Sequence, residues 1–214
     1  MNKRLLVPFF VLATLLTGFV SCSDETEEED EYANWEKRND AFLDSIVSIS
    51  SNPPSDETWE THLSYKLQSD EDTDLGITKN DYVYMKILKE GDEDGATPMS
   101  TDSVYTAYKG MLINEEEFDY SYSGDFDLAY TEANYVTLAS AVITGWTTAL
   151  LYMKEGERVM LYIPYKLAYG TDDYNTIPGY SLLIFDLYLG KVVHPEGPDD
   201  RSLVEGEILE EEEE

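Results

Sequence analysis

The chain has 214 residues, of which 45 are acidic and 14 are basic, and its formal net charge is −31. This length suits one ordinary domain with additional segments, or two small domains. The charge excludes nucleic acids as partners, because phosphate binding draws on clustered Lys and Arg, and it excludes attraction to anionic lipid headgroups.

The N-terminus has the pattern of a secretory signal peptide over residues 1–21. Lys3 and Arg4 form its positive start, and residues 5–20 form an apolar run shorter than the ~20 residues that a membrane-spanning helix needs. The one cysteine of the sequence, Cys22, follows Ser21 at the end of this run, and Phe19-Val20-Ser21-Cys22 resembles the lipobox of bacterial lipoproteins. The resemblance implies an acylated, palmitate-bearing Cys22 that anchors the chain to the outer membrane in the envelope of a Gram-negative bacterium, on its periplasmic or surface face. A leftover thiol or an intermolecular disulfide is the alternative.

Acidic segments follow this cysteine and also end the chain. Residues 22–31 are almost entirely polar, repel one another, and predict an extended tether. An acidic stretch directly behind an acylated cysteine also resembles the surface-export signals of some Gram-negative lipoproteins. Residues 194–214 are expected to form an acidic tail.

Residues 32–80 are predicted to be a helical extension and a linker. Apolar side chains at Trp35, Phe42, Ile46 and Ile49 recur at helical spacing, and Asn52-Pro53-Pro54 ends the helix. This face is expected either to dock on the chain's own globular domain or to pair two copies in a homodimer through residues 35–49. A short strand is expected at residues 63–67.

Residues 70–81 carry a spacing of carboxylates that is partly similar to a calcium-binding loop. Asp70, Asp72 and Asp74 alternate, and Asp81 occupies the twelfth position, but Leu75 replaces the glycine that such loops require. The alternatives are a calcium site and a solvated acidic loop, and the departures favour the loop.

From residue 81 to residue 193 the sequence becomes rich in strands. Strands are expected at residues 82–89, 103–112, 135–138, 157–164 and 181–191, with an acidic irregular excursion at 124–134 and a helix at 147–153. The helix follows Val142-Ile143-Thr144-Gly145-Trp146 at once. A tryptophan at such a junction is either core packing or the floor of an apolar cavity.

Eight short motifs, in this order and spacing, resemble the FKBP-type peptidyl-prolyl cis-trans isomerases. They are Tyr108-Lys109-Gly110-Met111-Leu112, Phe118-Asp119, Val142-Ile143-Thr144-Gly145-Trp146, Met153-Lys154-Glu155-Gly156-Glu157-Arg158, Ile163-Pro164, Leu167-Ala168-Tyr169-Gly170, Ile177-Pro178 and Leu183-Ile184-Phe185-Asp186. The resemblance implies an α+β fold in which an antiparallel sheet of five to six strands wraps around one short helix, here preceded by the N-terminal helix.

The resemblance also implies a site for isomerisation of X-Pro bonds. Trp146 would form its base; its walls would be Tyr108, Phe118, Val142, Ile143, Tyr169 and Phe185; Asp119 and the Tyr169 hydroxyl would be its polar groups; and Ile177 would offer its side chain and its backbone N–H. Among these, Asp119, Tyr169, Trp146 and Phe185 are expected to act on the twisting bond. No metal and no cofactor is expected, and the partners would be proline-containing polypeptides.

The sequence departs from the family pattern near Asp119. The family commonly has a basic residue a few positions later, but Ser123-Gly124-Asp125 contributes none. The second aromatic residue before the Val-Ile pair is matched by either Tyr135 or Val136. A catalytically weak peptide-binding or chaperone module is therefore the alternative to an efficient isomerase.

Overall fold

The computed structural model describes residues 31–68 and 76–195. The chain divides after Ala33 into two units, and everything below concerns the second, from Asn34 onward. The expectations for the signal peptide, Cys22, the acidic tether before Glu31, the first half of the possible calcium loop and most of the acidic tail lie outside the described residues. Within the described residues, none of the helices has the length and hydrophobicity needed to span a bilayer.

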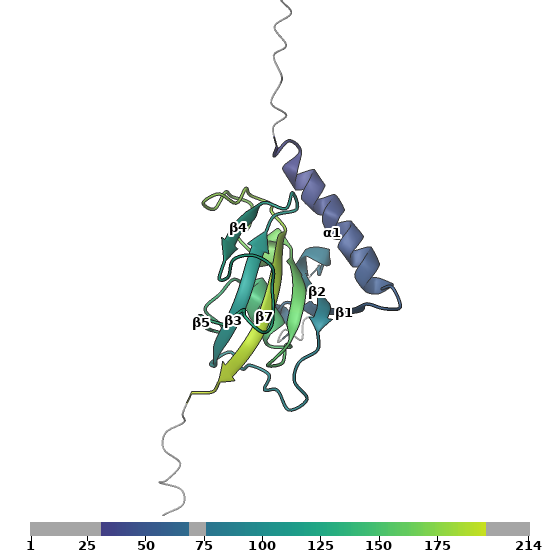
Figure 1. The fold of residues 1–214 in the computed structure, drawn as a ribbon. Coiled ribbons are helices and arrows are strands. Elements are labelled where there is room, and N and C mark those ends of the chain that lie inside the picture. The colour runs from purple at the N-terminus through teal and green to yellow at the C-terminus, as the bar shows by residue number, and fades with distance from the viewer. Residues whose placement is uncertain (1–30, 69–75, 196–214) are drawn as a thin grey trace, which may run out of the picture. The chain divides into compact units, whose positions relative to one another are not determined.

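Seven antiparallel strands form one sheet in the order β1-β2-β6-β7-β3-β4, and β5 also pairs with β3 (Figure 1). The strands are β1 (Thr58–Leu63), β2 (Tyr82–Lys89), β3 (Ser103–Met111), β4 (Glu117–Tyr120), β5 (Tyr135–Leu138), β6 (Arg158–Ile163) and β7 (Leu183–Val193). The α+β fold class is confirmed. The sheet has more strands than the five to six that the resemblance implies. The count includes β1, which lies before residue 81, and the two short strands β4 and β5.

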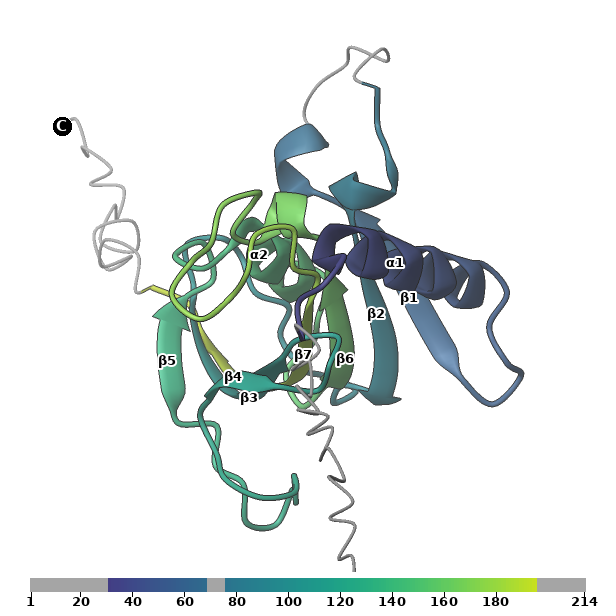
Figure 2. The ribbon, with the colours of Figure 1, turned by 90° about the horizontal axis from the view of Figure 1, so that it is seen from above.

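Both faces of the sheet are covered, as the alternation of its side chains requires. Val83 and Met85 of β2 are fully buried on the face that α2 (Thr144–Leu150) contacts. Tyr84 of the same strand lies in a second cluster with Leu43 and Ile46 of α1 (Trp35–Ser51). Figure 2 shows α1 and α2 as two distinct helices, with α1 next to β1 and β2.

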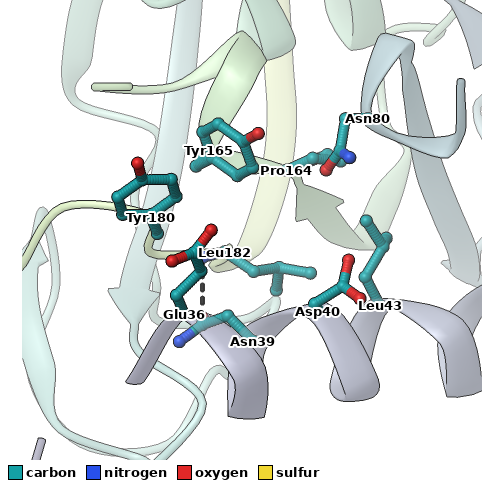
Figure 3. A pocket seen from close by; sticks show the side chains of 9 residues that line it. All are labelled: Glu36, Asn39, Asp40, Leu43, Asn80, Pro164, Tyr165, Tyr180 and Leu182. Atoms are coloured by element: carbon teal, nitrogen blue, oxygen red, sulfur yellow. Dashed lines mark hydrogen bonds between the residues drawn. The ribbon is translucent and has the colours of Figure 1, made fainter. Parts of the chain in front are cut away.

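The α1 helix docks on its own domain through specific contacts as well as apolar ones. Trp35, Leu43 and Ile46 are buried, whereas Ile49 is exposed. The Trp35 Nε1–H donates to Ser181 Oγ at 2.8 Å, and the Leu182 backbone N–H donates to Asn39 Oδ1 at 2.8 Å (Figure 3). The apolar face predicted from the sequence is therefore occupied within one chain, as the first of the two alternatives expects.

The α2 helix begins earlier than the sequence pattern predicts. It starts at Thr144 and ends at Leu150, so Trp146 lies inside the helix and does not precede it. Ile143 is the N-cap, with extended backbone, and the Thr148 Oγ1–H donates back to the Thr144 carbonyl at 2.8 Å. Gly145 permits this position, because a Cβ there would lie 2.3 Å from Ile163 Cγ2 of β6.

Two further expectations are corrected in the N-terminal part. The strand expected at residues 63–67 is a 3-10 turn at Tyr65–Leu67, and the strand precedes it at Thr58–Leu63, where His62 and Leu63 pair with β2. Asp81 is buried, accepts hydrogen bonds from the Thr78 N–H and hydroxyl, and pairs with Lys166. The Asp81 carboxylate is therefore paired with groups of the protein itself and not with a cation.

Candidate active site

An open cavity of about 300 Å³ lies among β3, β4, β5, β7, α2 and the 165–180 loop. Its lining residues are Tyr108, Asp119, Tyr135, Ala141, Val142, Ile143, Trp146, Tyr169, Tyr174 and Phe185. This volume is at the lower end of the range for small-ligand sites, which are mostly apolar with a few convergent polar groups.

The base of the cavity is a cluster of buried aromatic rings at right angles to one another. Trp146 of α2 meets Tyr108 of β3 at a centroid distance of 5.1 Å and Phe185 of β7 at 5.2 Å, with interplanar angles of 89° and 85°. Edge-to-face pairs of this kind are preferred by the aromatic quadrupoles and fix the ring positions. The base is therefore rigid, apolar and shaped before any ligand arrives.

Asp119 is the acidic residue of the cavity wall, and its partner is a tyrosine. The Tyr108 hydroxyl donates to Asp119 Oδ2 at 2.9 Å. Burial, together with this hydrogen bond to a carboxylate, raises the pKa of Tyr108 well above its ordinary value, so the hydroxyl keeps its proton. Tyr108 thus orients Asp119 in a sequence that lacks the nearby basic residue.

The opposite wall is a pair of stacked tyrosines from the 165–180 loop. The rings of Tyr169 and Tyr174 are 4.1 Å apart and almost parallel, at 6°. Burial raises the pKa of Tyr169, and the nearby Tyr174 and Asp119 add to the shift, so its hydroxyl remains a donor at neutral pH.

The loop that carries these two tyrosines is closed by backbone hydrogen bonds. Tyr174 and Ile177 exchange two bonds of 2.9 Å, and the Tyr180 N–H donates to the Gly170 carbonyl at 2.9 Å. These bonds hold the loop in one shape without regular secondary structure, and the stacked tyrosines keep their place at the rim.

Val142 and Ile143 form the side of the cavity next to α2. The Ile143 carbonyl accepts from the Thr147 N–H at 3.1 Å, which begins the helix. The Ile143 N–H has no acceptor among the described residues, so it is available to a carbonyl group of a bound chain.

Seven of the nine site residues expected from the sequence line this cavity: Tyr108, Asp119, Val142, Ile143, Trp146, Tyr169 and Phe185. Phe118 lies behind Phe185, with ring centroids 5.5 Å apart, and both rings fill the space that a Cβ on Gly110 would need. Ile177 is buried outside the lining, and its N–H donates to the Tyr174 carbonyl. The backbone donor expected at Ile177 is therefore already used.

Three lining residues were not assigned to the site from the sequence. Tyr135, one of two candidates for the second aromatic position, contacts Tyr108 edge-on at 5.1 Å, whereas Val136 points elsewhere and is half exposed. Nothing in the sequence marks Ala141 or Tyr174 as a site residue. Ala141 is small, and Tyr174 is one of the 17 tyrosines of the chain and lies in an acidic loop. The only sequence feature that could have pointed to Tyr174 is its place five positions after Tyr169.

The acidic excursion at residues 124–134 does not cover the cavity. None of its residues contributes to the lining, and Phe126 packs against Tyr188 and under the Arg158 guanidinium, which lies 4.0 Å from its ring centroid. Arg158 in turn makes a two-pronged ion pair with Asp186 at 2.8 and 2.6 Å. The excursion is held at this cluster, and the mouth of the cavity remains open.

Comparison with known proteins agrees with this geometry. The sequence model of the FKBP-type peptidyl-prolyl cis-trans isomerase domain matches residues 95–190. The chain is 37% identical over 119 residues to FKBP-type peptidyl-prolyl cis-trans isomerase FkpA of Buchnera aphidicola (subspecies Acyrthosiphon pisum), which covers 56% of this chain and 46% of that protein. It is 39% identical over 95 residues to FkpA of Escherichia coli K12, covering 44% and 33% of the two chains.

The chain spans less than half the length of these curated relatives. A crystal structure of FkpA from Escherichia coli superimposes with a TM-score of 0.48 at 27% identity, covering 75% of this chain and 63% of that one. The region that matches the domain, residues 95–190, contains every lining residue of the aromatic cavity. Residues 95–190 of the chain are therefore similar to the FKBP-type peptidyl-prolyl cis-trans isomerase domain.

Proposed function

We propose that this protein accelerates cis-trans isomerisation of X-Pro bonds in exported polypeptides and so assists their folding, with residues 81–193 as the isomerase domain. The observation that supports this most directly is the apolar cavity with Trp146, Tyr108 and Phe185 at its base and Asp119 in its wall. Its substrates would be proline-containing chains, bound without a covalent intermediate.

Physical chemistry explains why such a cavity suffices. Rotation about the X-Pro bond has a barrier of about 18–20 kcal/mol, because amide resonance is lost in the twisted state. Resonance separates charge, so water stabilises the planar form more than the twisted form. A cavity that takes the prolyl ring out of water removes part of that preference, and hydrogen bonds formed only in the twisted state lower the barrier further.

The described residues suggest a role for each group. The rings of Trp146, Tyr108 and Phe185 would hold the prolyl ring, with Val142 and Ile143 beside it. The Ile143 N–H and the Tyr169 hydroxyl would donate to carbonyl oxygens of the bound chain. Asp119, oriented by Tyr108, would supply a polar contact where charge develops on the twisting amide.

A kinetic assay on short X-Pro peptides tests the proposal. We expect the full chain to exceed the uncatalysed rate, and Tyr108→Phe, which loses the hydrogen bond to Asp119, to lower kcat/KM by roughly tenfold. Tyr152→Phe is the matched control, because Tyr152 loses a hydroxyl that accepts only from Gln68 Nε2, outside the cavity lining. A wild-type rate equal to the background would refute the proposal.

A binding or chaperone module without efficient turnover is the second candidate. The used Ile177 N–H and the missing basic residue near Asp119 favour it over a fast isomerase. In that case peptides would bind in the cavity with measurable affinity while the isomerisation rate stayed at the background.

We also propose that Cys22 carries the lipid anchor, in the envelope of a Gram-negative bacterium and at its outer membrane. The support is the match of residues 19–22 to the lipobox after a signal-like segment. Labelling with a palmitate analogue should mark the full chain and not Cys22→Ser, and equal labelling of both would exclude the anchor. A homodimer through residues 35–49 remains a prediction that would have to use the exposed side of the helix, such as Ile49.

A further inference from the structure

The β5 strand is an edge strand with an apolar surface. Its four residues pair only with Ser103 to Thr106 of β3 within the described part of the chain. Tyr135 is 38% exposed, Val136 49% and Leu138 47%, which is unusual for a strand of this composition. Natural edge strands are normally protected by Lys, Pro, a bulge or a cover, and apart from its shortness β5 has none of these.

The register of β5 shows which backbone groups face outward. The Ala139 N–H donates to the Asp102 carbonyl, so residues 135, 137 and 139 turn their backbone groups toward β3. The backbone N–H and C=O groups of Val136 and Leu138 therefore point away from β3. The Ala141 N–H donates to the Leu138 carbonyl at 3.0 Å. Among the described residues, the N–H and C=O of Val136 and the N–H of Leu138 then have no partner.

This open edge is continuous with the cavity through Tyr135. The Tyr135 ring lies 5.1 Å from Tyr108 and 6.5 Å from Trp146, and it lines the cavity from the first position of β5. Tyr108 sits on β3 between the stretch that pairs with β5 and the stretch that pairs with β4. The outer edge of β5 therefore begins at the rim of the cavity, with Val136 next to Tyr135.

Charge restricts what can lie on this edge. Between Lys109 and Lys154 the sequence has seven acidic residues and no Lys, Arg or His. This stretch contains β4, β5 and the excursion between them, and the basic side chains that contact it from outside, Lys109 and Arg158, are paired with Glu117 and Asp186. The charge that the stretch itself brings to the edge is therefore negative. Complementarity selects a segment with basic and apolar side chains and disfavours an acidic one.

We propose that the outer edge of β5 binds the client polypeptide next to its proline as an added strand, and selects extended segments that carry apolar and basic residues. The backbone of Val136 supplies the pairing groups and the exposed side chains of β5 supply the apolar contact. This rests on the proposed function for the choice of a prolyl chain, but the binding step is separable from turnover.

Proline at position 136 tests the pairing. Val136→Pro removes an N–H that faces away from β3, which edge positions tolerate, and Val136→Thr keeps that N–H at similar volume. We expect a twelve-residue peptide with a central Phe-Pro and flanking lysines to bind Val136→Pro about two- to tenfold more weakly than Val136→Thr, as measured by fluorescence anisotropy. Equal affinity of the two variants would overturn the proposal.

Hydrogen exchange on the unmodified full chain gives a second readout that does not depend on the variants folding. The Val136 N–H should exchange more slowly when the lysine-flanked peptide is bound, and unchanged exchange would also overturn the proposal. The same peptide with glutamates in place of the lysines should bind more weakly at low salt, and equal binding would exclude the charge selection. If these outcomes hold while isomerisation is absent, the proposed enzyme activity fails and the docking edge stands.

Discussion

Tyr108 is the residue on which the geometry of the cavity depends most. Its ring meets Trp146, Tyr135 and Phe185, and its hydroxyl holds Asp119. One side chain thus contributes to the apolar base and to the position of the carboxylate. Such a combination explains how this chain keeps Asp119 ordered without a basic neighbour in sequence.

Glu157 offers a test of electrostatics at the residue scale. Its side chain is 7% exposed and accepts from the Lys154 N–H at 2.8 Å. Burial raises the pKa of Glu157, and repulsion from Glu60 and Glu90 adds to this, against the lowering effect of the Lys154 contacts. Its contribution to stability is therefore complete below the unfolded pKa of about 4.3 and is lost as the pH rises through the higher folded value.

Glu157→Gln should stabilise the protein at neutral pH, because the amide keeps an acceptor for the Lys154 N–H without the buried charge. We expect a rise in Tm on the order of a few degrees at pH 7 that shrinks toward pH 4. Glu93→Gln, at an exposed site, changes the net charge equally and is the control. The difference in Tm between Glu157→Gln and wild type should be larger at pH 7 than at pH 4. A smaller difference at pH 7 would contradict this account.

At the scale of elements, α1 is joined to the segment that ends the tyrosine-bearing loop. Trp35 donates to Ser181 Oγ, and the Ser181 hydroxyl donates to the Pro178 carbonyl at 2.6 Å. Next to it, Asn39 Oδ1 accepts a hydrogen bond from the Leu182 backbone N–H. A cavity of about 70 Å³ lies between α1 and this segment, so these specific bonds hold the two together beside the apolar contact of Leu43 and Ile46 with Leu182 (Figure 3).

Removing these bonds should loosen the wall that Tyr169 and Tyr174 form. Trp35→Phe and Asn39→Ala are each expected to reduce the free energy of unfolding by about 1–2 kcal/mol and to raise KM for X-Pro peptides more than they lower kcat. The measurements are urea denaturation and steady-state kinetics.

Phe42→Leu provides the comparison on the same helix, since Phe42 packs on Tyr162 at 6.4 Å and takes part in neither of the hydrogen bonds to Ser181 and Leu182. It should lower stability and leave KM as in wild type. If Trp35→Phe and Asn39→Ala also leave KM unchanged while stability falls, α1 only stabilises the fold and does not position the site.

For the whole molecule, sequence reasoning recovered what is encoded locally. The strands at residues 82–89 and 135–138 were predicted with their observed bounds, because the first alternates and the second lies between polar segments. The start of α2 was predicted too late, since Thr144 and Gly145 are weak helix formers and only the close approach to Ile163 explains them. The cavity itself was found through the order of its motifs, which reflects the family fold.

What the sequence could not supply depends on distant contacts. Phe118 and Phe185 are both aromatic strand residues, and only the pairing of Gly110 with Phe185 and Asp119 decides which ring faces the cavity and which lies behind it. Tyr174 joins the site through its stack on Tyr169, and the Ile177 N–H is consumed within the same loop. Local pattern carries none of this information.

The contacts of α1 also determine the order in which the chain can fold. The bond from Trp35 to Ser181 spans 146 residues, and the bond from Leu182 to Asn39 spans 143. β7, which follows directly, lies between β6 and β3 in the sheet, so the sheet cannot close before it is made. The bonds of Trp35 and Asn39 at the start of the first helix therefore form only after residues 181 and 182 exist, whereas Leu43 and Ile46 can pack on Tyr84 of β2 earlier.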